Sequence, residues 1–147
     1  MKSPLVSELS LQRTFNAPRE RVFRAWSDPE LLKLWLGGHG VKSLHARVDF
    51  RVGGMYEMDM QVPTDAGIQR LCGIYQEIKA PEKLVFTWSW GDKYSADDAT
   101  LVTVTFIEND GKTTMTLKHE RFDSAPARDM HIKGWDMCVN RLVNLFP

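Results

Sequence analysis

The last stretch of the chain, Pro126 to Phe146, most constrains the fold, because it has the pattern of a long amphipathic helix. Its apolar positions recur at steps of three to five residues, which fits a helical period; they are Met130, Trp135, Cys138, Leu142 and Leu145. Charged and amide side chains interrupt this stripe, so the helix does not span a membrane. The residues before it are mostly typical of strands, and we expect the helix to bury its stripe against their sheet.

The chain before this helix begins with one strand and two short helices. Apolar and polar side chains alternate from Leu9 to Phe15, which indicates a half-buried strand. Pro18 then suits the first turn of a helix, and Asp28-Pro29 is a second start signal, a cap followed by a proline. The glycine-rich run Gly37 to Gly40 ends the second helix.

Six further strands are expected from Val41 onward, joined by short turns such as Asn109-Asp110-Gly111. Short turns predict an antiparallel meander with one wet face, which includes Glu57 and Asp59, and one buried face. The alternation does not define the phase of the strand Ile68 to Ile78, and Gly73 within it indicates a bulge or a bend. The expected buried face carries Tyr56, Met58, Met60, Phe86, Trp88, Trp90, Val102, Val104, Phe106, Met115 and Leu117.

The composition indicates one domain over residues 1–147 and excludes some partners. Nineteen basic and nineteen acidic residues give a net charge of zero, so neither nucleic acid nor an anionic membrane is an expected partner. A charge near zero also permits self-association, so a homodimer is possible. Met1 to Ser10 has no apolar signal core, and no run of 18 apolar residues follows, so we expect a soluble, cytoplasmic protein.

No pattern for a metal, a cofactor or nucleophilic catalysis is present. Cys72 and Cys138 are far apart in the sequence, and we expect two buried thiols, with one disulfide as the alternative. The histidines have no metal-ligand spacing, and the chain has no GxSxG motif and no phosphate-binding loop. We therefore assign no catalytic residue and expect no metal and no cofactor. His39 and His45 are expected at the surface and His131 could face either way, whereas His119 has the phase of the buried face.

Several motifs resemble one family in the same order along nearly the whole chain. Trp26-Ser27-Asp28-Pro29-Glu30-Leu31-Leu32 with Trp35 is similar to the helix pair of the activator of heat-shock-protein-90 ATPase homologue-like branch of the START-like (SRPBCC) superfamily. Asp49, Arg51, Gly53, Gly54 and Tyr56 resemble its glycine bulge, Tyr75 to Ile78 and Pro81 to Trp88 its central hairpin, and Gly134-Trp135 the start of its closing-helix signature. The resemblance implies an α+β helix-grip fold, a curved antiparallel sheet wrapped around the C-terminal helix, and a cavity between them.

Our first hypothesis is therefore that the protein binds a small apolar or aromatic molecule in this cavity. Its entrance would lie between the final helix and the loops Gly37 to Gly40 and Gly91 to Asp98. A cofactor-free enzyme of the cyclase or isomerase kind, with His119 or Tyr56 as acid or base, and a chaperone-interaction module are the alternatives. Plain core packing is the alternative role for each candidate ligand-binding residue, and these residues are Trp26, Trp35, Tyr56, Met58, Phe86, Trp88, Trp90, Val104, Phe106, Leu117, His119, Trp135 and Cys138.

Overall fold

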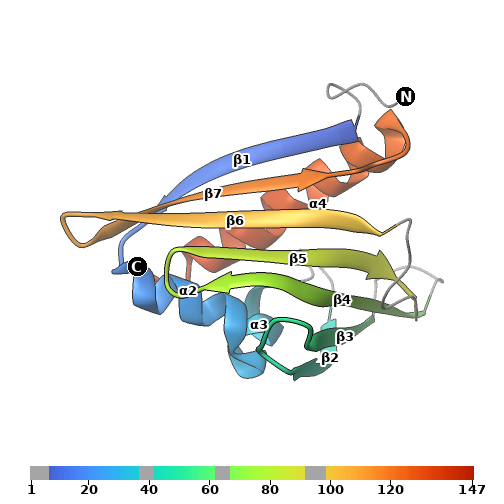
Figure 1. Cartoon of the computed structure of the whole chain (residues 1–147), viewed down its shortest axis with the longest axis horizontal. Coiled ribbons are helices and arrows are strands. Elements are labelled where there is room, and N and C mark those ends of the chain that lie inside the picture. The colour runs from blue at the N-terminus through green and yellow to red at the C-terminus, as the bar shows by residue number, and fades with distance from the viewer. Residues whose placement is uncertain (1–6, 37–41, 62–66, 92–98) are drawn as a thin grey trace.

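One curved antiparallel sheet and a long helix laid across it make up most of the protein (Figure 1). The structure is a computed structural model that describes residues 7–36, 42–61, 67–91 and 99–147. The elements in chain order are β1 (Glu8–Phe15), α2 (Arg19–Ser27), α3 (Pro29–Trp35), β2 (Lys42–Val48), β3 (Met55–Gln61), β4 (Ile68–Lys79), β5 (Lys83–Trp90), β6 (Thr100–Asn109), β7 (Lys112–Glu120) and α4 (Ala125–Val143).

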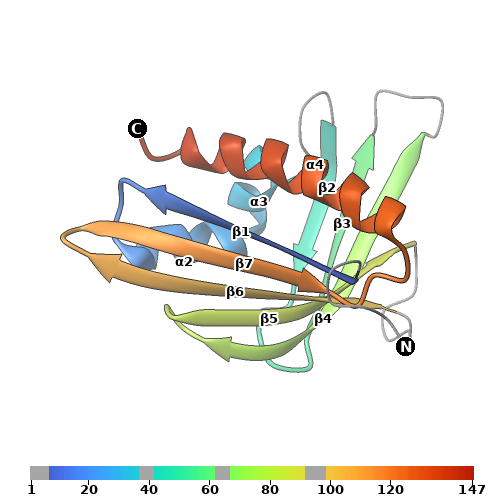
Figure 2. The same cartoon turned by 90° about the horizontal axis from the view of Figure 1, so that it is seen from above.

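The sheet has the predicted meander topology. Its seven strands lie in the order β1-β7-β6-β5-β4-β3-β2, so each strand from β2 to β7 pairs with its neighbour in the chain. The first strand pairs with β7, with Leu11 opposite Leu117. The β6–β7 hairpin turns through Asp110 and Gly111 at φ of 54° and 78°, as their sequence predicts. Figure 2 shows how strongly the sheet bends, since β2 and β3 run at a steep angle to β1 and β7, and α4 crosses β2 and β3 on one side of the sheet.

The helices begin where the sequence predicts. The Asp28 carboxylate accepts a hydrogen bond from the amide of Glu30 at 2.9 Å, with Pro29 in the first turn of α3. Ser124 caps α4 by accepting from the amide of Ala127 at 3.2 Å. The buried stripe of α4 consists of Trp135, Cys138, Val139 and Leu142. Met130, which we assigned to this stripe, is 65% exposed. The helix therefore packs tightly only along its second half.

Strand β4 has the irregularity that its sequence predicts, but the register shift and Gly73 lie at different positions in the strand. The register shift against β5 lies between Tyr75 and Glu77. Gly73 instead pairs with Tyr56 on β3, whose hydroxyl donates to the carbonyl oxygen of Thr87 on β5 at 2.6 Å. The Tyr56 ring passes so close to Gly73 that a Cβ there would lie 2.6 Å from its Cε1 atom. Glycine at this position is thus what lets one aromatic side chain tie three strands together.

The outer face of β2 to β4 differs from our expectation in one residue. Glu57 was predicted to be solvated, but its side chain is only 5% exposed. Side chains of His45, Arg47 and Arg70 lie 3.5–3.7 Å from its carboxylate and cover it. A carboxylate beside the two guanidinium groups of Arg47 and Arg70 keeps favourable electrostatic contacts when it loses water, which explains the burial.

Some of the loops discussed from the sequence lie within the described residues, and others do not. Arg51 and Asp49, which we compared with the family's glycine bulge, form an ion pair beside the paired glycines, with Nε 2.9 Å from Oδ2. His39, the turn at 63–66 and the loop at 92–98 lie outside the described residues. No helix in the described ranges is long and apolar enough to cross a membrane.

Candidate functional site

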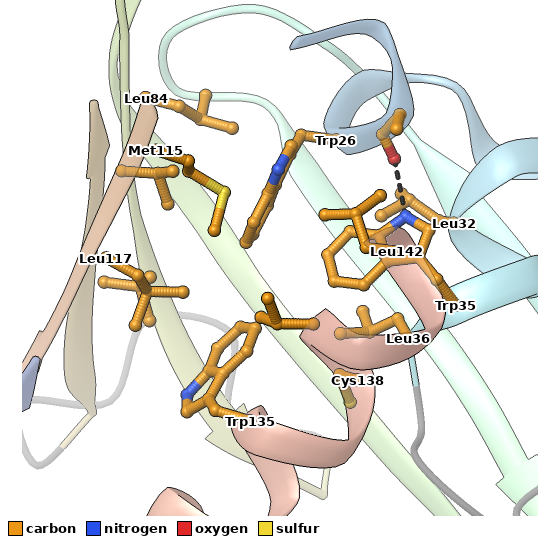
Figure 3. Close-up of a cluster of buried hydrophobic side chains, with 14 of the residues drawn as sticks. Trp26, Leu32, Trp35, Leu36, Leu84, Met115, Leu117, Trp135, Cys138 and Leu142 are labelled. Carbon is orange, nitrogen blue, oxygen red and sulfur yellow. Dashed lines mark hydrogen bonds between the residues drawn. The ribbon is translucent and has the colours of Figure 1, made fainter. Parts of the chain in front are cut away.

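Part of the space between α4 and the sheet is filled by aromatic and aliphatic side chains. Figure 3 shows side chains from the sheet, from α2 and α3, and from α4 meeting in this region. The ring of Trp26 lies 4.6 Å from that of Trp35 and 5.9 Å from that of Trp135, measured between centroids. The indole of Trp35 is anchored by a 2.9 Å hydrogen bond to the carbonyl oxygen of Ala25. These side chains form packed core, in which the free space is limited to a small cavity beside Trp26 and Trp135.

The first half of α4 instead lines one side of a pocket with a volume of about 780 Å³, which we call the large pocket. Its other walls come from the end of α3 and from β3, β4 and β5, at the end of the sheet where β4 begins. The lining side chains are mostly apolar, with a few polar groups among them. They belong to Leu36, Met60, Ile68, Gln69, Arg70, Trp88, Trp90, Gly91, Met130, His131, Gly134, Trp135 and Cys138.

A second, much smaller cavity of about 20 Å³ lies deeper in the molecule, and we call it the inner cavity. It has room for about one water molecule. Leu36, Trp88 and Trp135 line both spaces, so these three side chains form a common wall. The other lining residues of the inner cavity are Trp26, Leu32, Tyr56, Tyr75 and Phe86.

A buried histidine holds Trp135 in this wall. The Trp135 indole donates to Nδ1 of His119 at 3.0 Å, so Nδ1 carries no proton. Nε2 of His119 then carries the proton and donates to the Thr100 hydroxyl at 2.7 Å, and that hydroxyl donates to the carbonyl oxygen of Trp88 at 3.0 Å. Burial, and secondarily His131, lowers the pKa of His119 well below its ordinary value, because a charged imidazole would lose its hydration there.

A second histidine connects the helix to strand β5 at the edge of the pocket. His131 donates from Nδ1 to the carbonyl oxygen of Ala127 at 2.8 Å, and its Nε2 accepts from the Trp90 indole at 3.2 Å. Burial lowers the pKa of His131, while the bond to Ala127 opposes this shift. In the neutral state the Trp90–His131 bond therefore bridges sheet and helix.

The most polar part of the pocket lies at the start of β4. Arg70 makes two hydrogen bonds to the carboxylate of Asp59, at 2.8 and 3.1 Å. This side-chain bonding is the largest cause of the lowered pKa of Asp59. Gln69 is exposed on the adjacent position and also lines the pocket. The rim therefore presents the Gln69 amide and a guanidinium group already bonded to Asp59, whereas the deeper walls are apolar.

Gly134 leaves space in the pocket wall. It lies within α4, where glycine destabilises a helix by about 1 kcal/mol relative to alanine. A Cβ built on Gly134 would meet no atom within 4 Å, so no packing contact requires glycine there. A side chain at this position would extend into the large pocket instead.

Comparison with known proteins agrees with this architecture. The family model described as activator of Hsp90 ATPase homolog 1-like protein matches residues 16–147. The chain belongs to the AHSA1-like family. No curated protein matches the chain.

Solved structures of similar proteins have the same fold. A Chromobacterium violaceum protein is 26% identical, with a TM-score of 0.81 over 95% of this chain and 96% of its own. The AHSA1 protein of Silicibacter pomeroyi is 23% identical, with a TM-score of 0.78 over 94% and 96% of the two chains. A Nitrosomonas europaea protein is 23% identical, with a TM-score of 0.81 over 95% and 93%. The AHSA1-like chain thus has the helix-grip fold of the START-like superfamily, which supports a module of the cavity-type ligand-binding kind or of the chaperone-activator kind.

Only some of the thirteen candidate residues of this AHSA1-like chain line the large pocket or the inner cavity. Trp88, Trp90, Trp135 and Cys138 line the large pocket. Trp26, Tyr56 and Phe86 line the inner cavity. The remaining six are buried outside both linings, and they are Trp35, Met58, Val104, Phe106, Leu117 and His119. Ligand binding stays a prediction for all thirteen.

Other lining residues of the large pocket were not among the candidates, although some had a signal in the sequence. His131 and Gly134 precede Trp135 by four residues and by one, and the four-residue spacing puts His131 on the same helix face. Ile68 and Gln69 had no such signal, because the phase of β4 could not be read. Leu36 precedes the first loop expected at the entrance and Gly91 begins the second, and the loop residues 37–40 and 92–98 lie outside the described ranges.

The described residues contain no group of three or more histidine, cysteine, aspartate or glutamate side chains able to hold a metal ion. Cys72 and Cys138 are both buried, as expected. The arrangement therefore offers hydrophobic contact and a few hydrogen-bond donors.

Proposed function

We propose that this AHSA1-like protein binds a small apolar or aromatic molecule in the large pocket. The observation that carries this proposal is the pocket of about 780 Å³ between α4 and the sheet. Pockets of about 300–1,000 Å³ with apolar walls and few polar groups are typical of small-molecule sites. Burial of the ligand's apolar surface would supply the driving force, at about 25 cal/mol per Å² before ordering costs.

Aromatic side chains give the pocket its preference for flat or flexible apolar molecules. Trp88 and Trp135 lie with ring centroids 4.9 Å apart in its inner wall. Met60 and Met130 line other parts of the pocket, and thioether side chains adapt to ligands of varied shape. Trp90 would offer the ligand one more ring at the edge.

The alternative of a cavity enzyme receives no support from its two candidate acid–base groups. Both ring nitrogens of His119 are engaged in hydrogen bonds, and His119 does not line the large pocket. The Tyr56 hydroxyl donates to Thr87, and burial raises its pKa well above the ordinary value. Neither group is placed to exchange a proton with a molecule in the large pocket. A chaperone-interaction module remains the alternative suggested by the family description.

The proposal is tested by filling the pocket from Gly134. Gly134→Phe should weaken binding of the neutral fluorophore N-phenyl-1-naphthylamine by at least about ten-fold, because the new ring takes the space the probe needs. Gly134→Ala is the matched control. It should bind the probe like the parent protein and raise the free energy of unfolding by up to about 1 kcal/mol, because alanine is the better helix former.

Fluorescence titration measures probe binding, and thermal unfolding confirms that both variants are folded. Phenylalanine also has a higher helix propensity than glycine, so a folded Gly134→Phe protein is expected. Equal probe affinity in Gly134→Phe and in the parent protein would place the probe elsewhere and refute the proposal.

A further inference from the structure

The five tryptophans of the chain differ in whether their indole N–H group has a partner. Trp35, Trp90 and Trp135 donate to Ala25, His131 and His119 respectively. The indole nitrogens of Trp26 and Trp88 are buried and have no hydrogen-bond partner in the part of the chain that the structure describes. An indole N–H buried without a partner costs about 1–3 kcal/mol, so such donors are uncommon and call for an explanation.

The two tryptophans with unpartnered indole donors lie around the same cavity. Trp26 and Trp88 both line the inner cavity. Trp88 also lines the large pocket, and its side chain is only 7% exposed. A molecule in the large pocket therefore lies against Trp88, and the common wall of Leu36, Trp88 and Trp135 separates it from the inner cavity.

We propose that the bound molecule carries an uncharged hydrogen-bond acceptor, such as a carbonyl oxygen, that receives the indole N–H of Trp88. This inference rests on the proposed function and specifies its ligand: an apolar body in the large pocket and an acceptor oxygen directed at the inner cavity. The inner cavity of about 20 Å³ has room for one oxygen atom of this kind. Because the common wall separates the two spaces, the proposal requires that the Leu36 side chain move aside when the ligand binds.

The acceptor is expected to be uncharged because the described lining of the inner cavity holds no cationic side chain to stabilise an anion. None of the eight described residues that line the inner cavity is acidic or basic. A carboxylate moved into such surroundings would lose its hydration without gaining a cation, which costs far more than one or two indole donors return. Arg70, which lines the large pocket, is already bonded to Asp59.

Two probes of matched size and shape test the inference. Benzophenone has a carbonyl oxygen between its rings, whereas diphenylmethane has a methylene group at the same position. The parent protein should bind benzophenone about five-fold more tightly than diphenylmethane, as one net hydrogen bond allows. Trp88→Phe keeps an aromatic ring but removes the N–H donor, so this preference should disappear.

Trp90→Phe is the matched control, because Trp90 also lines the large pocket but its N–H already donates to His131. The preference for benzophenone should persist in that variant. A preference that survives Trp88→Phe, or that is absent from the parent protein while both probes bind, overturns this inference and leaves the proposed function standing. Failure of both probes to bind the parent protein overturns both.

A spectroscopic measurement covers the case in which Trp88→Phe does not fold. In the parent protein with ¹⁵N-labelled tryptophan, benzophenone should move one indole N–H signal downfield, and diphenylmethane should leave it in place. Trp90→Phe identifies the Trp90 signal by its loss, and the shifted signal should be a different one. If no indole signal responds to the carbonyl group, the inference is wrong.

Discussion

Replacing Gly73 by alanine is expected to destabilise the protein by about 3 kcal/mol or more, because the new methyl group has no space. The added Cβ would overlap the carbonyl oxygen of Thr87 and lie 2.7 Å from the Tyr56 hydroxyl oxygen. That hydroxyl and that carbonyl are bonded to each other, so a shift of either breaks the contact between β3 and β5. The midpoint of urea unfolding, compared at constant m-value, measures the effect.

Gly134→Ala is the control for a general effect of glycine replacement. Its Cβ meets open space, so its free energy of unfolding should rise. The two alanine variants should thus move in opposite directions from the parent protein. An unfolding free energy of Gly73→Ala within about 1 kcal/mol of the parent value would contradict the packing described for Tyr56.

Acidification is expected to destabilise the protein through His119, by up to about 1.4 kcal/mol per pH unit below the ordinary histidine pKa. Burial lowers the pKa of this side chain in the folded state. Below pH 6.5 the unfolded chain therefore binds a proton that the folded chain does not, and the folded state loses stability as the pH falls. The contribution is fully present above this pH. His131, whose pKa is also lowered, acts in the same direction.

The variant His119→Phe separates this effect from other titrations. At pH 7.5 it should be less stable than the parent protein by about 2–4 kcal/mol, because the indole of Trp135 and the hydroxyl of Thr100 lose their partner. Between pH 6.5 and 5 its stability should fall less steeply, so the two proteins should converge. Urea unfolding at several pH values measures both slopes, and equal slopes would contradict a neutral, buried His119.

Sequence patterns predicted the elements of the fold because the signals that make them are local. A cap and a proline begin α3 at Asp28-Pro29, and Asp110-Gly111 turns the last hairpin, each through the conformation of a few residues. Alternation along β6 and β7 is enough to place Leu117 and His119 on the buried face. Such signals need no knowledge of distant residues.

The candidate site was less predictable, because alternation distinguishes a buried face from a wet one but not a packed region from a hollow one. Val104 and Trp88 both lie on the buried face, yet only Trp88 lines the large pocket. Glu57 was misplaced for a related reason, since its burial depends on Arg70 from the next strand. The polar partners of Trp90 and Trp135 are also far from them in sequence.

The amino-acid sequence by itself determined the order of the strands and helices, since periodicity, caps and turn residues act over short distances. The helix-grip fold and the family were implied by the resemblance of its motifs, and the family model matches residues 16–147. Only the tertiary structure decided where the large pocket lies and which indole donors of the described residues are buried without a partner. The physical reason is that a cavity is the space left over when side chains from α3, α4 and three strands have packed, and no single segment defines that space.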